Sequence, residues 1–143
     1  MPAHAERRRF PYTPDQLFDL VADVERYPEF LPWCRAARIR SRDGSGFTAD
    51  LVIGFKMVRE RYTSRVVLDK PREVRAEAID GLFKALENRW RFVALPDGGT
   101  EVDFSVSFEF RSKVLQALIQ SLFAEAVRRM VAAFEARAKA LYG

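Results

Sequence analysis

The feature that most constrains this chain is a change in the spacing of its apolar residues near position 111. From Thr100 to Phe110 apolar and polar residues alternate, so that every second side chain is apolar. From Ser112 to about Leu141 apolar residues recur every three or four positions, and no proline interrupts them. Alternation is typical of a strand with one apolar face, and the longer spacing is typical of an amphipathic helix. The sequence therefore predicts a sheet and a long helix whose apolar faces cover each other.

Weaker alternation precedes this point, and it predicts further strands at residues 3–10, 47–55, 58–68, 73–79 and 87–95. The turn sequences Asp43–Gly46 and Pro96–Gly99 lie between runs with strand character, as hairpin turns do. A sheet with one polar face and hairpin connections is antiparallel.

Two short helices are expected after the first strand. Thr13 suits a helix N-cap, and Pro14 and Asp15 suit the first turn that follows it. A second helix over residues 23–30 is kept short by Pro28. We therefore expect one soluble α+β domain over residues 1–143. Its curved antiparallel sheet of six to seven strands wraps on the long C-terminal helix.

The residue types offer little for catalysis. Cys34 is the sole cysteine and His4 the sole histidine, so an internal disulfide is excluded and a catalytic triad or transition-metal site is disfavoured. No glycine-rich phosphate loop or dinucleotide fingerprint is present. We expect no catalytic residues, no metal and no cofactor, and a cyclase-type enzyme remains the third alternative.

The net charge of +4 is mildly basic, with clusters at Arg7–Arg9 and between Arg35 and Arg42. Such clusters either keep a protein in solution or bind anionic lipid, RNA or an acidic partner. No run of about 18 apolar residues is present, so we expect no membrane span. The expected location is the cytoplasm, with peripheral contact with the inner membrane.

The chain holds 12 Phe, 4 Tyr and 2 Trp, which fill a core or line a cavity. Segment 81–86, read as a connection, is unusually apolar and has three alternatives: covering a pocket mouth, touching a bilayer or entering the core. Segment 27–34 carries two prolines and several aromatic residues, and it serves equally well as an entrance or a buttress.

Several motifs resemble those of one family. The string Tyr27–Cys34 (YPEFLPWC) resembles the motif of the coenzyme Q-binding branch of the START-like helix-grip superfamily. The segments Gly54–Lys56, Gly81–Lys84, Trp90–Phe92 and Val102–Phe104 add weaker matches along the chain. No mitochondrial targeting extension precedes them, so the chain resembles the bacterial form.

The resemblance implies that the protein binds ubiquinone or a similar prenyl lipid as a ligand rather than as a redox cofactor. Bacterial relatives imply a second hypothesis, a ribosome-binding regulator that hinders subunit association, and polyketide cyclases imply the third. The partners expected are the lipid, an anionic membrane surface and the ribosome, but not DNA. The predicted ligand-binding residues are Phe30, Leu31, Trp33, Leu51, Ile53, Phe55, Leu82, Phe83, Trp90, Phe92, Phe104, Val106, Phe108, Leu118, Leu122 and Phe123. The predicted polar residues at the pocket mouth are Lys56, Tyr62, Lys84 and Asn88.

Overall fold

The strands and helices follow in the order that the apolar spacing predicts. The computed structural model of the chain describes residues 3–55 and 58–143. The elements are β1 (Ala3–Phe10), α1 (Pro14–Ala22), the 3-10 helix η1 (Val24–Glu29), β2 (Cys34–Asp43), β3 (Gly46–Phe55), β4 (Val58–Asp69), β5 (Glu73–Gly81), β6 (Phe83–Ala94), β7 (Thr100–Phe110) and α2 (Lys113–Tyr142).

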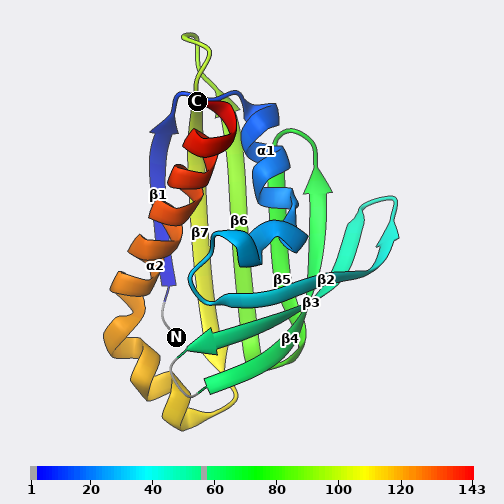
Figure 1. Cartoon of the computed structure of the whole chain (residues 1–143), viewed down its shortest axis with the longest axis vertical. Coiled ribbons are helices and arrows are strands. Elements are labelled where there is room, and N and C mark those ends of the chain that lie inside the picture. Colours follow the sequence, from blue (N-terminus) through cyan, green and yellow to red (C-terminus); the bar gives the residue numbers. More distant parts are fainter. Residues whose placement is uncertain (1–2, 56–57) are drawn as a thin grey trace.

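The seven strands form one sheet in the order β1-β7-β6-β5-β4-β3-β2, and every neighbouring pair is antiparallel. Strands β1 and β2 are therefore the two edges. Figure 1 shows the sheet curving behind α2, which runs along its concave side, while α1 and η1 lie beside the later turns of α2. This arrangement confirms the predicted fold class.

Both main helices begin with side-chain caps, and the cap at Thr13 is the predicted one. The Thr13 hydroxyl accepts a hydrogen bond from the Gln16 backbone N–H at 3.2 Å, and the Gln16 side chain accepts one from the Thr13 N–H at 2.9 Å. The Ser112 hydroxyl accepts from the Leu115 N–H at 3.2 Å. These bonds satisfy backbone donors that the first helical turn leaves without partners.

The packed core lies at the end of the molecule that holds α1, η1 and the second half of α2. Helix α2 contributes its four buried residues there, which are Val127, Val131, Phe134 and Ala138. The Phe134 ring centroid is 4.8 Å from that of Trp90, 5.3 Å from that of Phe30 and 5.5 Å from that of Tyr27. This aromatic cluster fixes η1 and α2 against the sheet.

Segment 81–86 differs from the sequence-based expectation, because most of it is strand rather than connection. Beyond the pair formed by Glu77 and Glu87, strands β5 and β6 separate. The β5 arm stays paired with β4, and the β6 arm stays paired with β7. The turn itself requires Gly81, whose φ is 101° and where a Cβ atom would lie 2.4 Å from the Arg61 carbonyl oxygen. The apolar side chains of segment 81–86 are therefore carried mainly by a strand of the sheet.

Candidate functional site

An apolar cavity of about 470 Å³ lies between the first half of α2 and the ends of β3, β6 and β7. Its lining is almost entirely aliphatic and aromatic. The lining residues are Trp33, Ile53, Leu82, Phe83, Val106, Phe108, Phe110, Leu115, Leu118, Ile119, Leu122, Phe123, Glu125, Ala126, Val127, Arg129 and Met130. The cavity lies within the roughly 300–1,000 Å³ range of small-molecule sites.

The cavity exists because the two halves of α2 are covered differently. In the second half, Val131 and Phe134 are fully buried against the sheet. Among residues 113–126, all of which the structure describes, none is fully buried. The apolar side chains of this first half therefore face those of the sheet across an open space.

The sheet side of the cavity is a wall of phenylalanine rings. Phe83 and Phe110 stack with their centroids 4.9 Å apart and an interplanar angle of 18°. Phe108 lies 5.3 Å from Phe110 and reaches Phe123 of α2 at 5.2 Å. Alternation along β7 places Val106, Phe108 and Phe110 on this inner side, as the sequence predicts. The wall offers flat, apolar surfaces to any molecule that enters.

The structure brings together part of the predicted ligand-binding set around this cavity. These residues are Trp33, Ile53, Leu82, Phe83, Val106, Phe108, Leu118, Leu122 and Phe123. Others lie elsewhere: Leu51, Trp90, Phe92 and Phe104 are buried in the packed core, and Phe30 and Leu31 pack partly buried against it. The Phe55 side chain lies outside the described residues.

Several lining residues were absent from that predicted set, namely Phe110, Leu115, Ile119, Glu125, Ala126, Val127, Arg129 and Met130. Leu115 and Ile119 lie on the predicted apolar face of the helix, and Phe110 ends the alternation of β7. For these three residues, the spacing of apolar residues in the sequence already indicated an inward-facing side chain. No comparable signal marks Glu125 and Arg129, whose side chains join the lining through an ion pair at 2.9 Å.

Of the residues predicted at the pocket mouth, Tyr62, Lys84 and Asn88 do not line this cavity. The Asn88 side chain donates to the Ser105 carbonyl at 3.2 Å and accepts from the Trp90 indole N–H at 2.9 Å. Both hydrogen bonds join residues of the sheet to each other. Lys84 is exposed and pairs with Glu109 at 3.5 Å. Lys56 lies outside the described residues.

Tyr62 comes nearer to the cavity than the other predicted mouth residues. Its ring meets the cavity-lining ring of Phe83 edge-on at 4.9 Å, so it stands behind the aromatic wall. Burial raises the pKa of the Tyr62 phenol above its ordinary value. Its hydroxyl is therefore protonated at neutral pH and is a hydrogen-bond donor rather than a base.

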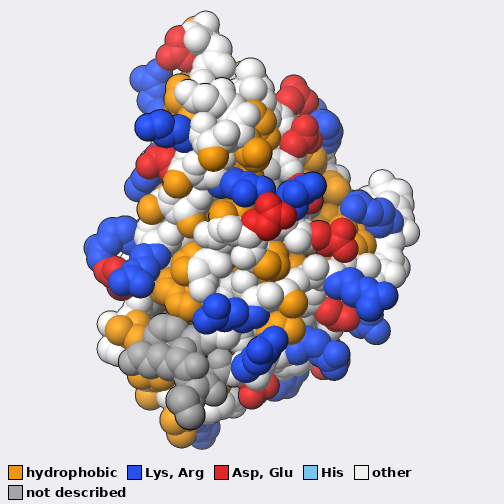
Figure 2. Space-filling view, in the orientation of Figure 1, with side chains coloured by type: hydrophobic (Ala, Val, Ile, Leu, Met, Phe, Trp, Pro, Cys, Tyr) orange, Lys and Arg blue, Asp and Glu red, His pale blue; other side chains and the backbone are white. Residues whose placement is uncertain are grey.

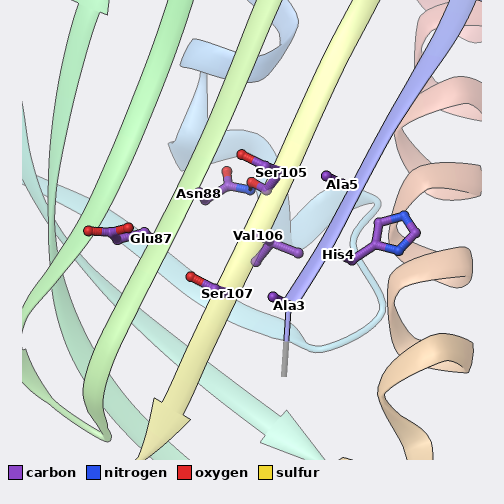
Figure 3. A pocket seen from close by; sticks show the side chains of 8 residues that line it. All are labelled: Ala3, His4, Ala5, Glu87, Asn88, Ser105, Val106 and Ser107. Atoms are coloured by element: carbon purple, nitrogen blue, oxygen red, sulfur yellow. Dashed lines mark hydrogen bonds between the residues drawn. The ribbon is translucent and has the colours of Figure 1, made fainter. Parts of the chain in front are cut away.

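A second hollow, of about 420 Å³, lies against β1, β6 and β7. Figure 3 shows its side chains, including His4, Glu87 and Asn88, coming from three neighbouring strands. The His4 ring lies on the side of α2, while Glu87 lies across β6 on the other side of the view. The nearest acid to His4 is Glu6, at 2.8 Å on the same strand. These groups do not converge on one point, as the partners of an acid–base site would.

The geometry also separates the two residues with the greatest nucleophilic or basic potential. Cys34 begins β2 and His4 lies on β1, which are opposite edges of the sheet. Burial raises the pKa of the Cys34 thiol to about 11, which disfavours the reactive thiolate. Within the described residues, no group of three or more His, Cys, Asp or Glu side chains is placed to hold a metal ion.

None of the helices formed by residues 3–55 and 58–143 has the length and apolar character needed to cross a membrane. The long helix α2 carries arginine, lysine and glutamate along its outer side, and much of its apolar side faces the sheet and the cavity.

The comparisons with known proteins agree with this fold. Over 133 residues, 90% of each chain, the protein is 42% identical to ribosome association toxin RatA of Rickettsia prowazekii. It is 39% identical over 145 residues to the mitochondrial coenzyme Q-binding protein COQ10 homolog B of Xenopus laevis, covering 98% of this chain and 59% of that protein.

The structure of a START superfamily protein from Mycobacterium smegmatis has the same fold, with a TM-score of 0.82 and 18% identity over 97% of this chain and 98% of that one. Residues 10–135 match the family described as polyketide cyclase / dehydrase and lipid transport. This chain, built as a START-like helix grip, therefore belongs to the polyketide cyclase / dehydrase and lipid transport family.

Proposed function

We propose that this protein binds ubiquinone or a similar prenyl lipid in the apolar cavity and carries it unchanged, in support of respiratory electron transfer. The observation that carries the proposal is the cavity itself, a space of about 470 Å³ between apolar faces of α2 and the sheet. The coenzyme Q-binding name of the Xenopus laevis relative supports the choice of ligand.

The lining suits a long isoprenoid chain. Such a chain has no hydrogen-bonding groups, and transferring its surface from water gains about 25 cal/mol per Å². Leu115, Ile119 and Leu122 offer flexible aliphatic contacts from the helix, and the phenylalanine wall offers flat contacts from the sheet. A quinone ring can stack on such aromatic faces.

Carriage without chemistry is supported by the described part of the lining, which offers no suitable base. A general base needs a titratable group aimed at the ligand, with a pKa near the working pH. Glu125 and Arg129, the charged residues in the described lining, pair with each other. The phenol of Tyr62 and the thiol of Cys34 both have raised pKa values and keep their protons at neutral pH.

The direct test is to express the protein in bacteria, purify it gently and analyse its organic extract for quinones by mass spectrometry. We expect close to one ubiquinone, or similar prenyl lipid, per protein. A purified protein that carries no prenyl lipid and takes up no added ubiquinone would overturn the proposal. Conversion of the bound quinone into another product would instead favour a cyclase-type enzyme.

A second candidate function, binding to the ribosome, is favoured by the arginines on the outer face of β2–β4. Arg38, Arg59 and Arg61 are exposed, and none forms an ion pair with a described residue. Arg35 lies across Gly54 of β3, where a Cβ atom would meet its Nε at 2.7 Å. Unpaired guanidinium groups on one surface suit the phosphates of RNA. The name of the Rickettsia prowazekii relative points the same way.

The ribosome candidate makes a specific prediction about salt. If these arginines contact RNA phosphates, binding to ribosomal subunits weakens steeply as salt rises. Replacing Arg38, Arg59 and Arg61 with glutamine should lower the slope of log affinity against log salt by roughly 2 to 3. An unchanged slope in the folded triple variant would remove this face from ribosome binding.

A further inference from the structure

The first turns of α2 carry an exposed apolar patch at the edge of the cavity. The Val114 side chain is 79% exposed and the Leu118 side chain, one turn later, is 40% exposed. Leu118 also lines the cavity, so the exposed patch continues into the lining. Figure 2 shows hydrophobic side chains at the lower left of the molecule, beside the area drawn in grey. Exposed apolar patches mark interaction sites more often than isolated exposed residues do.

Phe83 does not contribute to this patch, although segment 81–86 was one candidate for membrane contact. Its ring is half-buried, stacks on Phe110 and forms part of the cavity wall. At the cavity edge, Val114 and Leu118 of the helix are therefore more exposed than Phe83.

Two positively charged residues lie next to the patch in the chain. Arg111 and Lys113 flank the start of α2, and both side chains are exposed. The first turn of α2 contains no acidic residue, although the positive end of a helix favours one. The Arg111 Nε donates to the Gly81 carbonyl at 2.8 Å, which fixes this cation beside the end of β5. The patch is therefore an apolar tip beside cations, which is suited to a partner with anionic groups above an apolar interior.

We propose that residues Arg111–Leu118 dock on a bilayer that contains anionic lipid. Val114 and Leu118 enter the boundary between headgroups and hydrocarbon, and Arg111 and Lys113 contact the headgroups. The inference rests on the proposed function, since docking here joins the cavity to the hydrocarbon in which prenyl lipids dissolve. Phosphates of RNA would match the cations but would leave the exposed valine and leucine without a partner.

The surface is already in place for docking. Ser112 caps the first turn of α2, and the Gln116 side chain accepts a hydrogen bond from the Phe110 backbone N–H at 2.7 Å. These bonds hold the helix start against the end of β7. Docking therefore requires no reordering of this segment.

The test is co-sedimentation with vesicles of phosphatidylcholine alone and of phosphatidylcholine with phosphatidylglycerol, none of them containing quinone. We expect binding to the anionic vesicles to be at least roughly tenfold stronger than to the neutral ones. Val114→Asp should weaken it by more than roughly tenfold, and Lys113→Gln by roughly fivefold. Asp at this position favours helix formation, so loss of binding would not reflect loss of the helix.

Two matched controls test the location of the surface. Val93→Asp changes another exposed valine, on β6, and Lys139→Gln changes a lysine in the last turn of the same helix. Both should bind as the unchanged protein does. Docking would be overturned by absence of binding to anionic vesicles, or by equal losses in the controls. A dimer that Val114→Asp converts to monomers would also overturn it, because a second copy would then cover the patch.

Different results would contradict the carrier function and the docking surface. Protein that retains quinone after purification but does not bind anionic vesicles would remove the docking surface and leave the carrier function. Protein that binds the vesicles through Val114 but never takes up quinone would remove the carrier function and leave the docking surface.

Discussion

At the scale of single residues, neighbouring positions of β7 face opposite sides of the sheet, one toward the cavity and the next toward the outer surface. Val106 lines the cavity, while Ser107, the next residue, faces the other way. We expect Val106→Lys to abolish quinone uptake, because an ammonium group without a partner is strongly disfavoured in apolar surroundings. Uptake is measured by adding ubiquinone and extracting the re-purified protein.

The matched control for that substitution is Ser107→Lys, which places the same charge on the outer face. It should take up quinone as the unchanged protein does. A folded Val106→Lys variant with unchanged uptake would exclude this side of β7 from ligand binding.

The buried thiol gives a second prediction at this scale. Burial raises the Cys34 pKa to about 11, so at pH 8 its thiolate fraction is about 100-fold lower than that of an exposed thiol. Alkylation by iodoacetamide, followed by mass spectrometry, should be at least about 100-fold slower in the folded protein than in urea. Between pH 8 and pH 10 the folded rate should keep rising about tenfold per pH unit. Fast alkylation at pH 8 would mean that Cys34 is an activated, accessible thiol.

At the scale of elements, alternation in the sequence predicts which side chains face α2 but not how closely α2 approaches them. Phe104 and Phe108 occupy equivalent inward positions of β7, yet Phe104 is buried in the packed core and Phe108 lines the cavity. The difference depends on sheet curvature and on the path of the helix, and no local pattern encodes either. For this reason the predicted ligand set mixed core residues with cavity residues.

Two strand segments show where local patterns failed. In β2 the positions between Arg38, Arg40 and Arg42 hold Ile39 and Ser41, so few apolar residues mark a buried face and no strand bounds were predicted. Segment 81–86 looked like a connection because Gly81 breaks the pattern, but its arms are held by β4 and β7. Strand pairing across the sheet decided both segments, and that pairing is not local in sequence.

The unequal covering of α2 predicts unequal opening of its two halves. Backbone amides in residues 113–126 should exchange hydrogen for deuterium faster than those in residues 127–142, because only the second half has fully buried side chains. Bound quinone should slow exchange mainly in the first half. Equal protection of both halves in lipid-free protein would mean that the cavity is closed in solution.

At the scale of the whole molecule, the packed core and the cavity lie at opposite ends of helix α2. Phe134 contacts Tyr27, Phe30 and Trp90 in the core, and Leu122 borders the cavity. This division lets one end of the fold remain hollow while the packed end keeps the chain folded. An empty cavity forgoes the contacts that its lining would otherwise make, which is the cost of keeping a binding site.

The last prediction compares one truncation at each end. In lipid-free protein Phe134→Ala should lower the free energy of unfolding by about 3–5 kcal/mol, because it leaves a hole in a packed core. Leu122→Ala should cost only about 1 kcal/mol, because that side chain already borders open space. Urea unfolding measures both. Saturating quinone stabilises the folded state in proportion to the logarithm of its affinity, and Leu122→Ala should reduce that gain. If Leu122→Ala proved as costly as Phe134→Ala without lipid, both ends would be packed and the carrier proposal would lose its physical basis.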